Sequence, residues 1–261
     1  MDDVLLDFDR SPLARDPALA RHLVELPALE PPPLSARVLP VARRAWEARA
    51  RSEYVGVMVV RRFHGLLVDV NAPFDLQELA LTMLLQEQQH TALCMAAAKA
   101  LGSDGELSFE LAELQRPRTD APVDQQLVEM VVSAYCVGEV VALALIRHSI
   151  DVLPPSPYRD VLRRIARDEV LHGRLGAPLL RLIRSPEAKT WIDYPGDDVA
   201  RKIADDAIAL MRARDVVEAD EAALFEDPES AQQLTAVGVP PSKAFRAAYL
   251  EALESAMEVT R

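Results

Sequence analysis

The stretches Gln86-Glu87-Gln88-Gln89-His90 and Asp168-Glu169-Val170-Leu171-His172 decide how this chain is expected to fold. In each, a glutamate is followed three residues later by a histidine, within a segment whose apolar residues recur at helical spacing. Positions i and i+3 lie on one face of a helix, about a turn apart. A carboxylate and an imidazole so placed can bind one metal ion together, so two such pairs on two helices predict a site for two ions.

Two further glutamates complete the pattern. Glu53 precedes Glu87 by 34 residues, and Glu139 precedes Glu169 by 30. A carboxylate-bridged pair of metals inside a helical bundle takes one glutamate from each of two helices and a Glu-x-x-His pair from each of two others. Glu47 lies on the same predicted helix as Glu53, but it falls outside the inward apolar stripe, so Glu53 is the expected ligand. The predicted ligands are Glu53, Glu87, His90, Glu139, Glu169 and His172.

The composition favours an all-α protein, because only nine of 261 residues are glycine and alanine, leucine, arginine and glutamate are abundant. Ser156, followed by Pro157, is expected to cap the fourth long helix, and Asp75 the second. The long helices are predicted over about 35–70, 75–101, 123–153 and 157–184. The connector 102–122 carries a possible short helix at 107–114.

The remaining segments flank these helices. Residues 1–34 contain many prolines and predict an N-terminal arm with one short helix around 17–26. Residues 185–261 predict a C-terminal helical extension, with helices over about 197–225, 229–237 and 242 to 259. We therefore expect three parts: the arm 1–34, a bundle 35–184 and the extension 185–261.

Charge and cysteine content exclude several classes of protein. The net charge of −12 argues against binding to nucleic acid or to anionic membranes. We see no signal peptide and no uninterrupted apolar run of membrane-spanning length. The two cysteines, Cys94 and Cys136, form no CxxC motif and no disulfide framework. A cytoplasmic protein is the expectation, and a homodimer is left open.

The order Glu…Glu-x-x-His, repeated twice, resembles the ferritin-like di-iron carboxylate superfamily. This includes rubrerythrins, ribonucleotide reductase small subunits, methane-type monooxygenases and p-aminobenzoate N-oxygenases. The resemblance covers about residues 35–184 and implies a ferritin-like four-helix bundle. It also implies that Glu87 and Glu169 bridge two metals, that Glu53 and Glu139 are terminal ligands, and that His90 and His172 each complete one metal.

The ligand set suits two irons, and manganese or a mixed pair also fits, because hard oxygen ligands with a few nitrogens favour these metals. By the same resemblance, Asp168 accepts a hydrogen bond from the ring of His90 across the bundle. Gln86 holds the matching position for His172. A solvated helix residue is the other interpretation of Asp168.

Other positions distinguish this chain from particular families. Cys94 stands where ribonucleotide reductase small subunits usually carry the radical tyrosine, and methane-type hydroxylases carry a cysteine there. Ile165 replaces an extra histidine of the N-oxygenases. Tyr135, one turn before Glu139, is either a pocket or redox residue or a core tyrosine. A substrate pocket is expected among Tyr135, Cys94, Ala142 and Leu143.

The function that this resemblance implies is an oxidase or oxygenase. It would use dioxygen to hydroxylate, desaturate or N-oxygenate a small organic substrate. A separate electron donor, a ferredoxin or a reductase, would then be needed. Two alternatives remain: a ferroxidase or iron-handling protein without an organic substrate, and a helical scaffold with a structural di-metal site.

Overall fold

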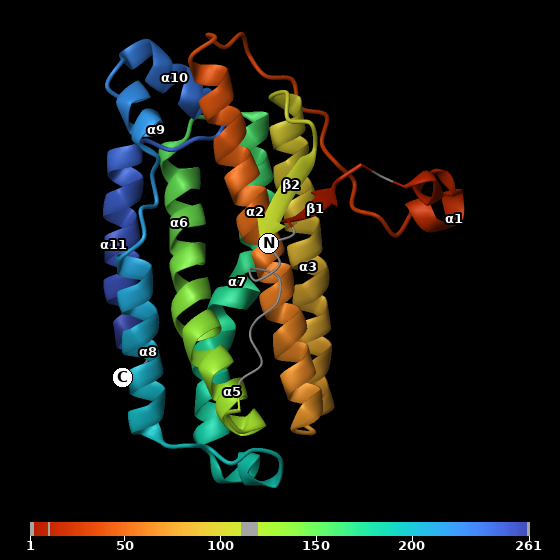
Figure 1. The fold of residues 1–261 in the computed structure, drawn as a ribbon, viewed down its shortest axis with the longest axis vertical. Coiled ribbons are helices and arrows are strands. Elements are labelled where there is room, and N and C mark those ends of the chain that lie inside the picture. The colour runs from red at the N-terminus through yellow and green to blue at the C-terminus, as the bar shows by residue number, and fades with distance from the viewer. Residues whose placement is uncertain (1–2, 10, 111–119, 260–261) are drawn as a thin grey trace.

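The computed structural model describes residues 3–9, 11–110 and 120–259 and is mostly helical, as the predicted all-α class requires. Its long helices run side by side along the long axis of the molecule (Figure 1). They are α2 (Val38–Asp69), α3 (Phe74–Ala100), α6 (Glu139–Val152) and α7 (Pro157–Arg184). The helix α5 (Val123–Met130) and a π-helical segment, η2 (Val131–Gly138), lead directly into α6.

The ends of these helices follow local signals in the sequence. The hydroxyl of Ser156 accepts a hydrogen bond from the backbone N–H of Arg159 at 3.2 Å, which confirms the predicted cap of α7. The prediction for α3 was wrong by two residues. Pro73 occupies its N-cap position, and Asp75 lies inside the first turn, where its charge faces the positive end of the helix dipole.

The predicted helix at 107–114 is wrong over its first four residues, and 111–114 lie outside the described residues. A strand, β2 (Glu106–Glu110), pairs there with β1 (Asp3–Asp7) in an antiparallel ladder with Val4 opposite Phe109. The physical reason is the alternation in Glu-Leu-Ser-Phe-Glu. It buries Leu107 and Phe109 on one side of the strand and exposes Glu106, Ser108 and Glu110 on the other.

The N-terminal arm contains less helix than expected. A 3-10 turn, η1 (Pro12–Arg15), precedes α1 (Pro17–Ala20), which stands apart from the long helices (Figure 1). Further along, Val24, Leu29 and Leu34 pack against the core, and Arg164 of α7 donates a hydrogen bond to the carbonyl of Glu25 at 2.8 Å. The arm is therefore attached at its start, through β1, and again by its second half.

The C-terminal extension contains η3 (Pro186–Thr190), α8 (Asp197–Arg212), α9 (Ala219–Leu224), α10 (Pro228–Ala236) and α11 (Ser242–Val259). The single helix predicted over 197–225 is wrong, because the chain leaves the helix after Arg212 and resumes it at Ala219. Val216, in the break, is half-buried against the core. The helices α8 and α11 lie alongside the π-helical segment and α6, respectively, and so cover one side of the molecule (Figure 1).

Two apolar clusters form the core. One contains Val60, Met83 and Leu179, and the other contains Trp46, Leu93 and Ile165. Along α3 and α7, the Glu-x-x-His residues come between the positions that belong to the two clusters. The core therefore has a polar layer at mid-height.

The continuous helix from Val123 to Val152 is long and apolar enough to span a membrane by length and composition, although it contains no long uninterrupted apolar run. Buried core helices meet the same criterion. Here the helix carries Glu139 at its centre and packs against α7 and α11. The hydropathy of this helix alone does not assign the chain to a membrane.

Candidate metal centre

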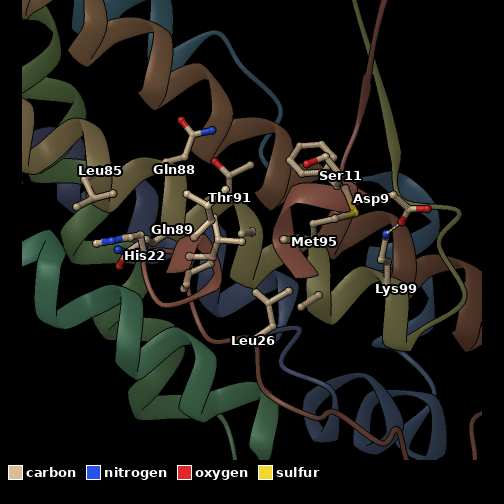
Figure 2. A pocket seen from close by; sticks show the side chains of 17 residues that line it. Asp9, Ser11, His22, Leu26, Leu85, Gln88, Gln89, Thr91, Met95 and Lys99 are labelled. Carbon is tan, nitrogen blue, oxygen red and sulfur yellow. Dashed lines mark hydrogen bonds and ion pairs between the residues drawn. The ribbon is translucent and has the colours of Figure 1, made fainter. Parts of the chain in front are cut away.

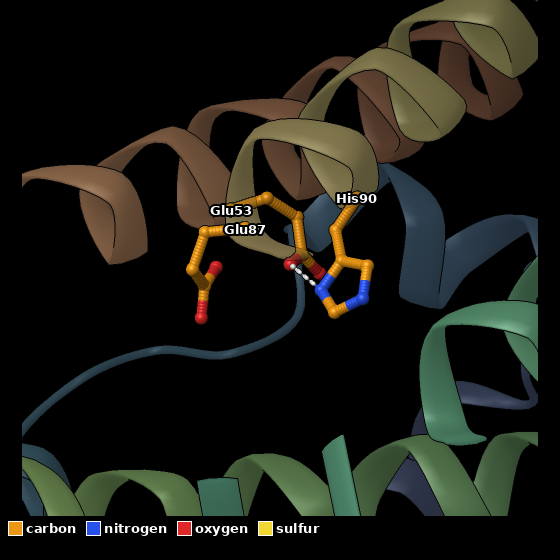
Figure 3. Close-up of side chains that lie close together, drawn as sticks. All are labelled: Glu53, Glu87 and His90. Carbon is orange, nitrogen blue, oxygen red and sulfur yellow. Dashed lines mark ion pairs between the residues drawn. The ribbon is translucent and has the colours of Figure 1, made fainter. Parts of the chain in front are cut away.

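The structure brings all six predicted ligands into the polar layer of the core. Glu53 comes from α2, Glu87 and His90 from α3, Glu139 from the first turn of α6, and Glu169 and His172 from α7. Glu87, Glu169 and both imidazoles are almost completely buried. Figure 3 shows Glu53, Glu87 and His90 converging on the space beneath α2 and α3.

Two overlapping groups of ligand atoms can be recognised. Atoms of Glu53, Glu87 and His90 lie within 4.8 Å of one another, and so do atoms of Glu87, Glu169 and His172. Glu87 belongs to both groups. Glu169 also reaches both imidazoles, with Oε1 at 3.1 Å from His90 Nδ1 and Oε2 at 3.6 Å from His172 Nδ1. These two carboxylates are therefore central, as bridging ligands would be.

The other two carboxylates each lie at one imidazole. Glu53 Oε2 lies 3.4 Å from His90 Nδ1, and Glu139 Oε2 lies 4.0 Å from His172 Nδ1. Glu47 is instead 3.8 Å from Arg43 in a partly exposed ion pair. The structure thus places Glu53, and not Glu47, beside the histidine.

The far nitrogen of each imidazole contacts the residue that the sequence predicts. His90 Nε2 lies 3.2 Å from Asp168 Oδ2, and His172 Nε2 lies 3.0 Å from Gln86 Oε1. Because both partners offer an oxygen, each Nε2 can donate its proton outward, and each Nδ1 faces the carboxylates, where it could bind a metal. The arrangement fixes both rings with Nδ1 toward the centre.

The atoms facing the centre lack hydrogen bonds. Nδ1 of His90, Nδ1 of His172 and Oε2 of Glu169 are buried without a hydrogen-bond partner among the described residues. Buried polar atoms are nearly always paired in folded proteins, so three such atoms in one place need an explanation. Metal ions at the centre would bind all three, and the donor set fits them.

The electrostatics also indicate missing positive charge. Burial, and then repulsion from the neighbouring carboxylates, raises the pKa of Glu87 and of Glu139 well above the usual range. Burial alone would lower the pKa of His90, but the close carboxylates of Glu169 and Glu53 raise it to about 11. Burial would raise the pKa of Glu169, but the nearby imidazoles of His90 and His172 lower it. Without metal, a proton on His90 offsets part of the negative charge.

Gly56, which the sequence analysis did not single out, shapes this centre. A Cβ built on Gly56, one turn after Glu53 on α2, would lie 2.3 Å from Glu87 Oε2. Only a residue without a side chain lets the Glu87 carboxylate lie so close to α2. The signal was available, because glycine in a helix interior is unfavourable and usually has a packing or functional reason.

The approach of α7 to the π-helical segment also depends on a glycine. A Cβ on Gly176 would lie 2.5 Å from the backbone carbonyl of Tyr135. The π-helical segment ends immediately before Glu139, and an extra residue per turn changes the direction in which the following side chains point. The composition of Val131–Gly138 gave no signal for this geometry.

A cavity of about 120 Å³ opens onto the carboxylates. Its walls are Ser52, Glu53, Gly56, Glu87, Glu139, Ala142, Ile146 and Glu169. Of the expected pocket residues only Ala142 is among them. This corrects the prediction for Tyr135, Cys94 and Leu143. Tyr135 is fully buried against Phe63, with ring centroids 4.6 Å apart, and Cys94 is fully buried in the Trp46 cluster.

A larger, mainly apolar pocket of about 720 Å³ lies between the N-terminal arm and the outer face of α3 (Figure 2). Leu85, Gln88 and Met95 of α3 line it together with His22 and Leu26 of the arm. None of the six ligands is in its wall, and Glu87 and His90, the two on α3, point instead toward the other helices of the bundle. This pocket does not give access to the centre.

No family model matches this chain, and neither a curated protein nor a solved structure matches it. The functional argument therefore rests on the chemistry of the site.

Proposed function

We propose that this chain is a ferritin-like di-iron protein that uses dioxygen to oxidise a small organic molecule. One observation carries the proposal. Two buried imidazoles each direct an unpaired Nδ1 at the same group of four carboxylates, while their Nε2 atoms contact Asp168 and Gln86. The hydrogen bonds of the two imidazoles are made by Nε2 and leave both Nδ1 atoms unused. Two metals bound at the centre would take one Nδ1 atom each as a ligand.

The architecture in this proposal is a four-helix bundle of α2, α3, α5–η2–α6 and α7, with the C-terminal extension packed on it. Each of the four helices supplies at least one ligand. The pairing of α2 with α3 and of α6 with α7 supports two halves that each carry Glu and Glu-x-x-His. This is the arrangement on which ferritin-like di-metal sites are built.

Each ligand has a role in this proposal. Glu87 and Glu169 bridge the two metals, Glu53 and His90 complete one, and Glu139 and His172 complete the other. Four carboxylates and two neutral imidazoles offset the charge of two divalent cations, and such hard donors suit iron or manganese. Two irons bound here would supply the reduction of dioxygen, with electrons from a separate donor protein.

The chain itself provides a site for a second reactant. The cavity beside Glu53 and Glu139 has neither imidazole in its wall, and Ala142 and Ile146 give it an apolar wall. Apolar walls limit water at the centre and leave room for a small group. Tyr135, with its pKa raised by burial and by Glu139, stays protonated beside the ligands and contributes packing.

The small size of this cavity favours one alternative, a ferroxidase without an organic substrate. An opening of about 120 Å³ admits an ion as readily as it admits part of an organic molecule. Oxygen uptake by the reduced protein would separate the two. An oxygenase consumes oxygen in proportion to added substrate, whereas a ferroxidase consumes it in proportion to added iron(II). A structural metal site does neither.

Iron content tests the centre directly. After anaerobic loading with iron(II) and desalting, elemental analysis should find about two irons per chain, as the six-ligand set requires. Glu87→Ala and Glu169→Ala should lose most of this iron, because each removes a ligand shared by both metals. Glu47→Ala is the matched control on α2 and should retain it. Trace iron in the wild-type protein, or equal iron in all variants, would contradict the proposal.

A further inference from the structure

A second cavity adjoins the proposed metal centre. Its volume is about 730 Å³, and its walls come from α2, α6, α9 and α11, the break between α8 and α9, and the segment after α10. Ser52 lines both this cavity and the small one at the carboxylates. On α6, Leu145 lines the large cavity and the next residue, Ile146, lines the small one. The two cavities are therefore neighbours that share Ser52 as a wall residue.

One face of α2 connects the two cavities. Arg49, Ser52, Glu53 and Gly56 follow the spacing i, i+3, i+4, i+7 and so share that face. Arg49 lines the large cavity, and Glu53 lines the small one. Four residues of helix separate them, which corresponds to about 6 Å along the axis. A molecule of modest length can contact both ends.

Arg49 is a cation whose hydrogen-bond donors are mostly unused. Its guanidinium lies 4.8 Å from the ring centroid of Trp46 and donates one hydrogen bond, to the carbonyl of Gly238 at 2.9 Å. Among the described residues it forms no ion pair, although a guanidinium offers five N–H donors. Burial lowers the pKa of Arg49, because the charged form loses solvation. Most of its donors remain for a ligand.

The carboxylates around the same cavity are mostly engaged. Glu218 is exposed at the rim. The other four have partners: Asp220 with Arg44, Asp215 with Arg246, Glu47 with Arg43, and Glu221 with the hydroxyl of Ser242. Attraction to Glu221 and Glu53 offsets part of the charge of Arg49, but neither carboxylate forms an ion pair with its guanidinium among the described residues, so its remaining N–H donors stay available in this cavity.

We propose that the large cavity binds the carboxylate of an organic acid through Arg49, with the body of the acid extending past Ser52 toward Glu53 and Glu139. This rests on the proposed function and names its substrate class. A carboxylate matches the planar fork of a guanidinium, and the nearby acidic side chains would repel a dianion such as phosphate more strongly. Val216, Val239 and Phe245 offer the hydrocarbon body an apolar wall.

Tryptophan fluorescence of the metal-free protein tests this directly. The chain has two tryptophans, Trp46 and Trp191, and Trp46 lies against Arg49. In a Trp191→Phe background the signal belongs to Trp46. We would titrate benzoate, phenylacetate and octanoate, each against its neutral amide. At least one acid should change the fluorescence saturably and bind about tenfold or more tightly than its amide, as expected for hydrogen bonds to a charged group.

Matched variants assign the preference to one residue. Arg49→Met should abolish the preference for acid over amide, while Arg44→Met, which changes a paired arginine at the same cavity, should retain it. The comparison of acid with amide in the Trp191→Phe background does not depend on whether Arg49→Met or Arg44→Met folds. Equal binding of acids and amides, no binding of any of the three acids, or an unchanged preference in folded Arg49→Met would overturn the proposal.

This outcome is separable from that of the proposed function. Acid binding is measured without metal, and iron content is measured without acid. Normal iron binding with no acid preference would overturn only the substrate class. Trace iron together with tight acid binding would overturn only the di-iron function.

Discussion

The two imidazoles of the centre differ in the residue that accepts their Nε2 protons. His90 faces the carboxylate of Asp168 at 3.2 Å, whereas His172 faces the amide oxygen of Gln86 at 3.0 Å. A carboxylate acceptor raises the basicity of an imidazole more than an amide does. We therefore predict that the metal on the His90 side is bound more tightly and that Asp168→Asn weakens it about 10–100-fold.

Metal titrations that resolve two binding steps provide the measurement. Asp168→Asn should weaken the tighter step alone, and Gln86→Ala should weaken the other. Equal weakening of both steps by Asp168→Asn would show that this residue does not act through His90, and no change would show that it is a solvated helix residue.

The ligand pairs could be predicted because the i, i+3 spacing puts Glu87 and His90 on one face of a helix. The roles of Asp168 and Gln86 were expected from the resemblance to di-iron proteins. The cavity wall was not predictable in this way. Spacing does not give the rotation of each helix relative to its neighbours, so Tyr135 and Cys94, although close to the ligands, are buried outside the wall of the small cavity.

The glycines of α2 allow a test at the level of one helix. Gly56 and Gly65 lie in the same helix, but a Cβ on Gly56 would meet Glu87 Oε2 at 2.3 Å, and a Cβ on Gly65 would meet nothing within 4 Å. Alanine is favoured over glycine in a helix interior by about 0.5–1 kcal/mol. Gly65→Ala should raise the free energy of unfolding by about that amount, with unchanged metal content.

Gly56→Ala should behave differently. The new methyl group must displace the Glu87 carboxylate, so metal affinity should fall even where the metal-free protein keeps its stability. Urea unfolding of the metal-free protein, combined with metal titration, separates the two effects. If both alanine variants bind metal like the wild type, the close contact between Gly56 and Glu87 is not required for binding.

Element boundaries were predictable where local chemistry sets them and not elsewhere. Ser156 caps α7 and Pro157 is its first residue, so α7 begins where the sequence predicts. The strand β2 depends on β1, about a hundred residues earlier in the chain, and its short alternation is easily taken for part of a helix. The break between α8 and α9 contains no glycine or proline, and it places Val216 against the core. Tertiary packing decides such sites.

The whole molecule buries a layer of carboxylates between two apolar clusters, and this arrangement predicts how its stability depends on pH. His90 has a folded pKa of about 11 against an ordinary value of 6.5, so the stability it contributes is complete below pH 6.5 and is lost as the pH rises toward 11. Glu87 and Glu139, with pKa values raised above 4.5, lose their contribution in the same direction. Glu169, with a lowered pKa, loses its contribution only in acid.

Between pH 6.5 and about pH 9, His90, Glu87 and Glu139 therefore all lower stability as the pH rises, while Glu169 contributes no change. The free energy of unfolding of the metal-free protein should fall over this range. Bound metal replaces the protons, so the stabilisation that metal provides should grow over the same range. Urea unfolding with and without manganese(II), which needs no exclusion of air, measures both. Glu139→Gln removes one buried charge and should flatten the metal-free curve. The prediction would be contradicted if the free energy of unfolding of the metal-free protein rose with pH. It would also be contradicted if the stabilisation by manganese(II) did not depend on pH, because the buried carboxylates would then not be the groups that bind the metal.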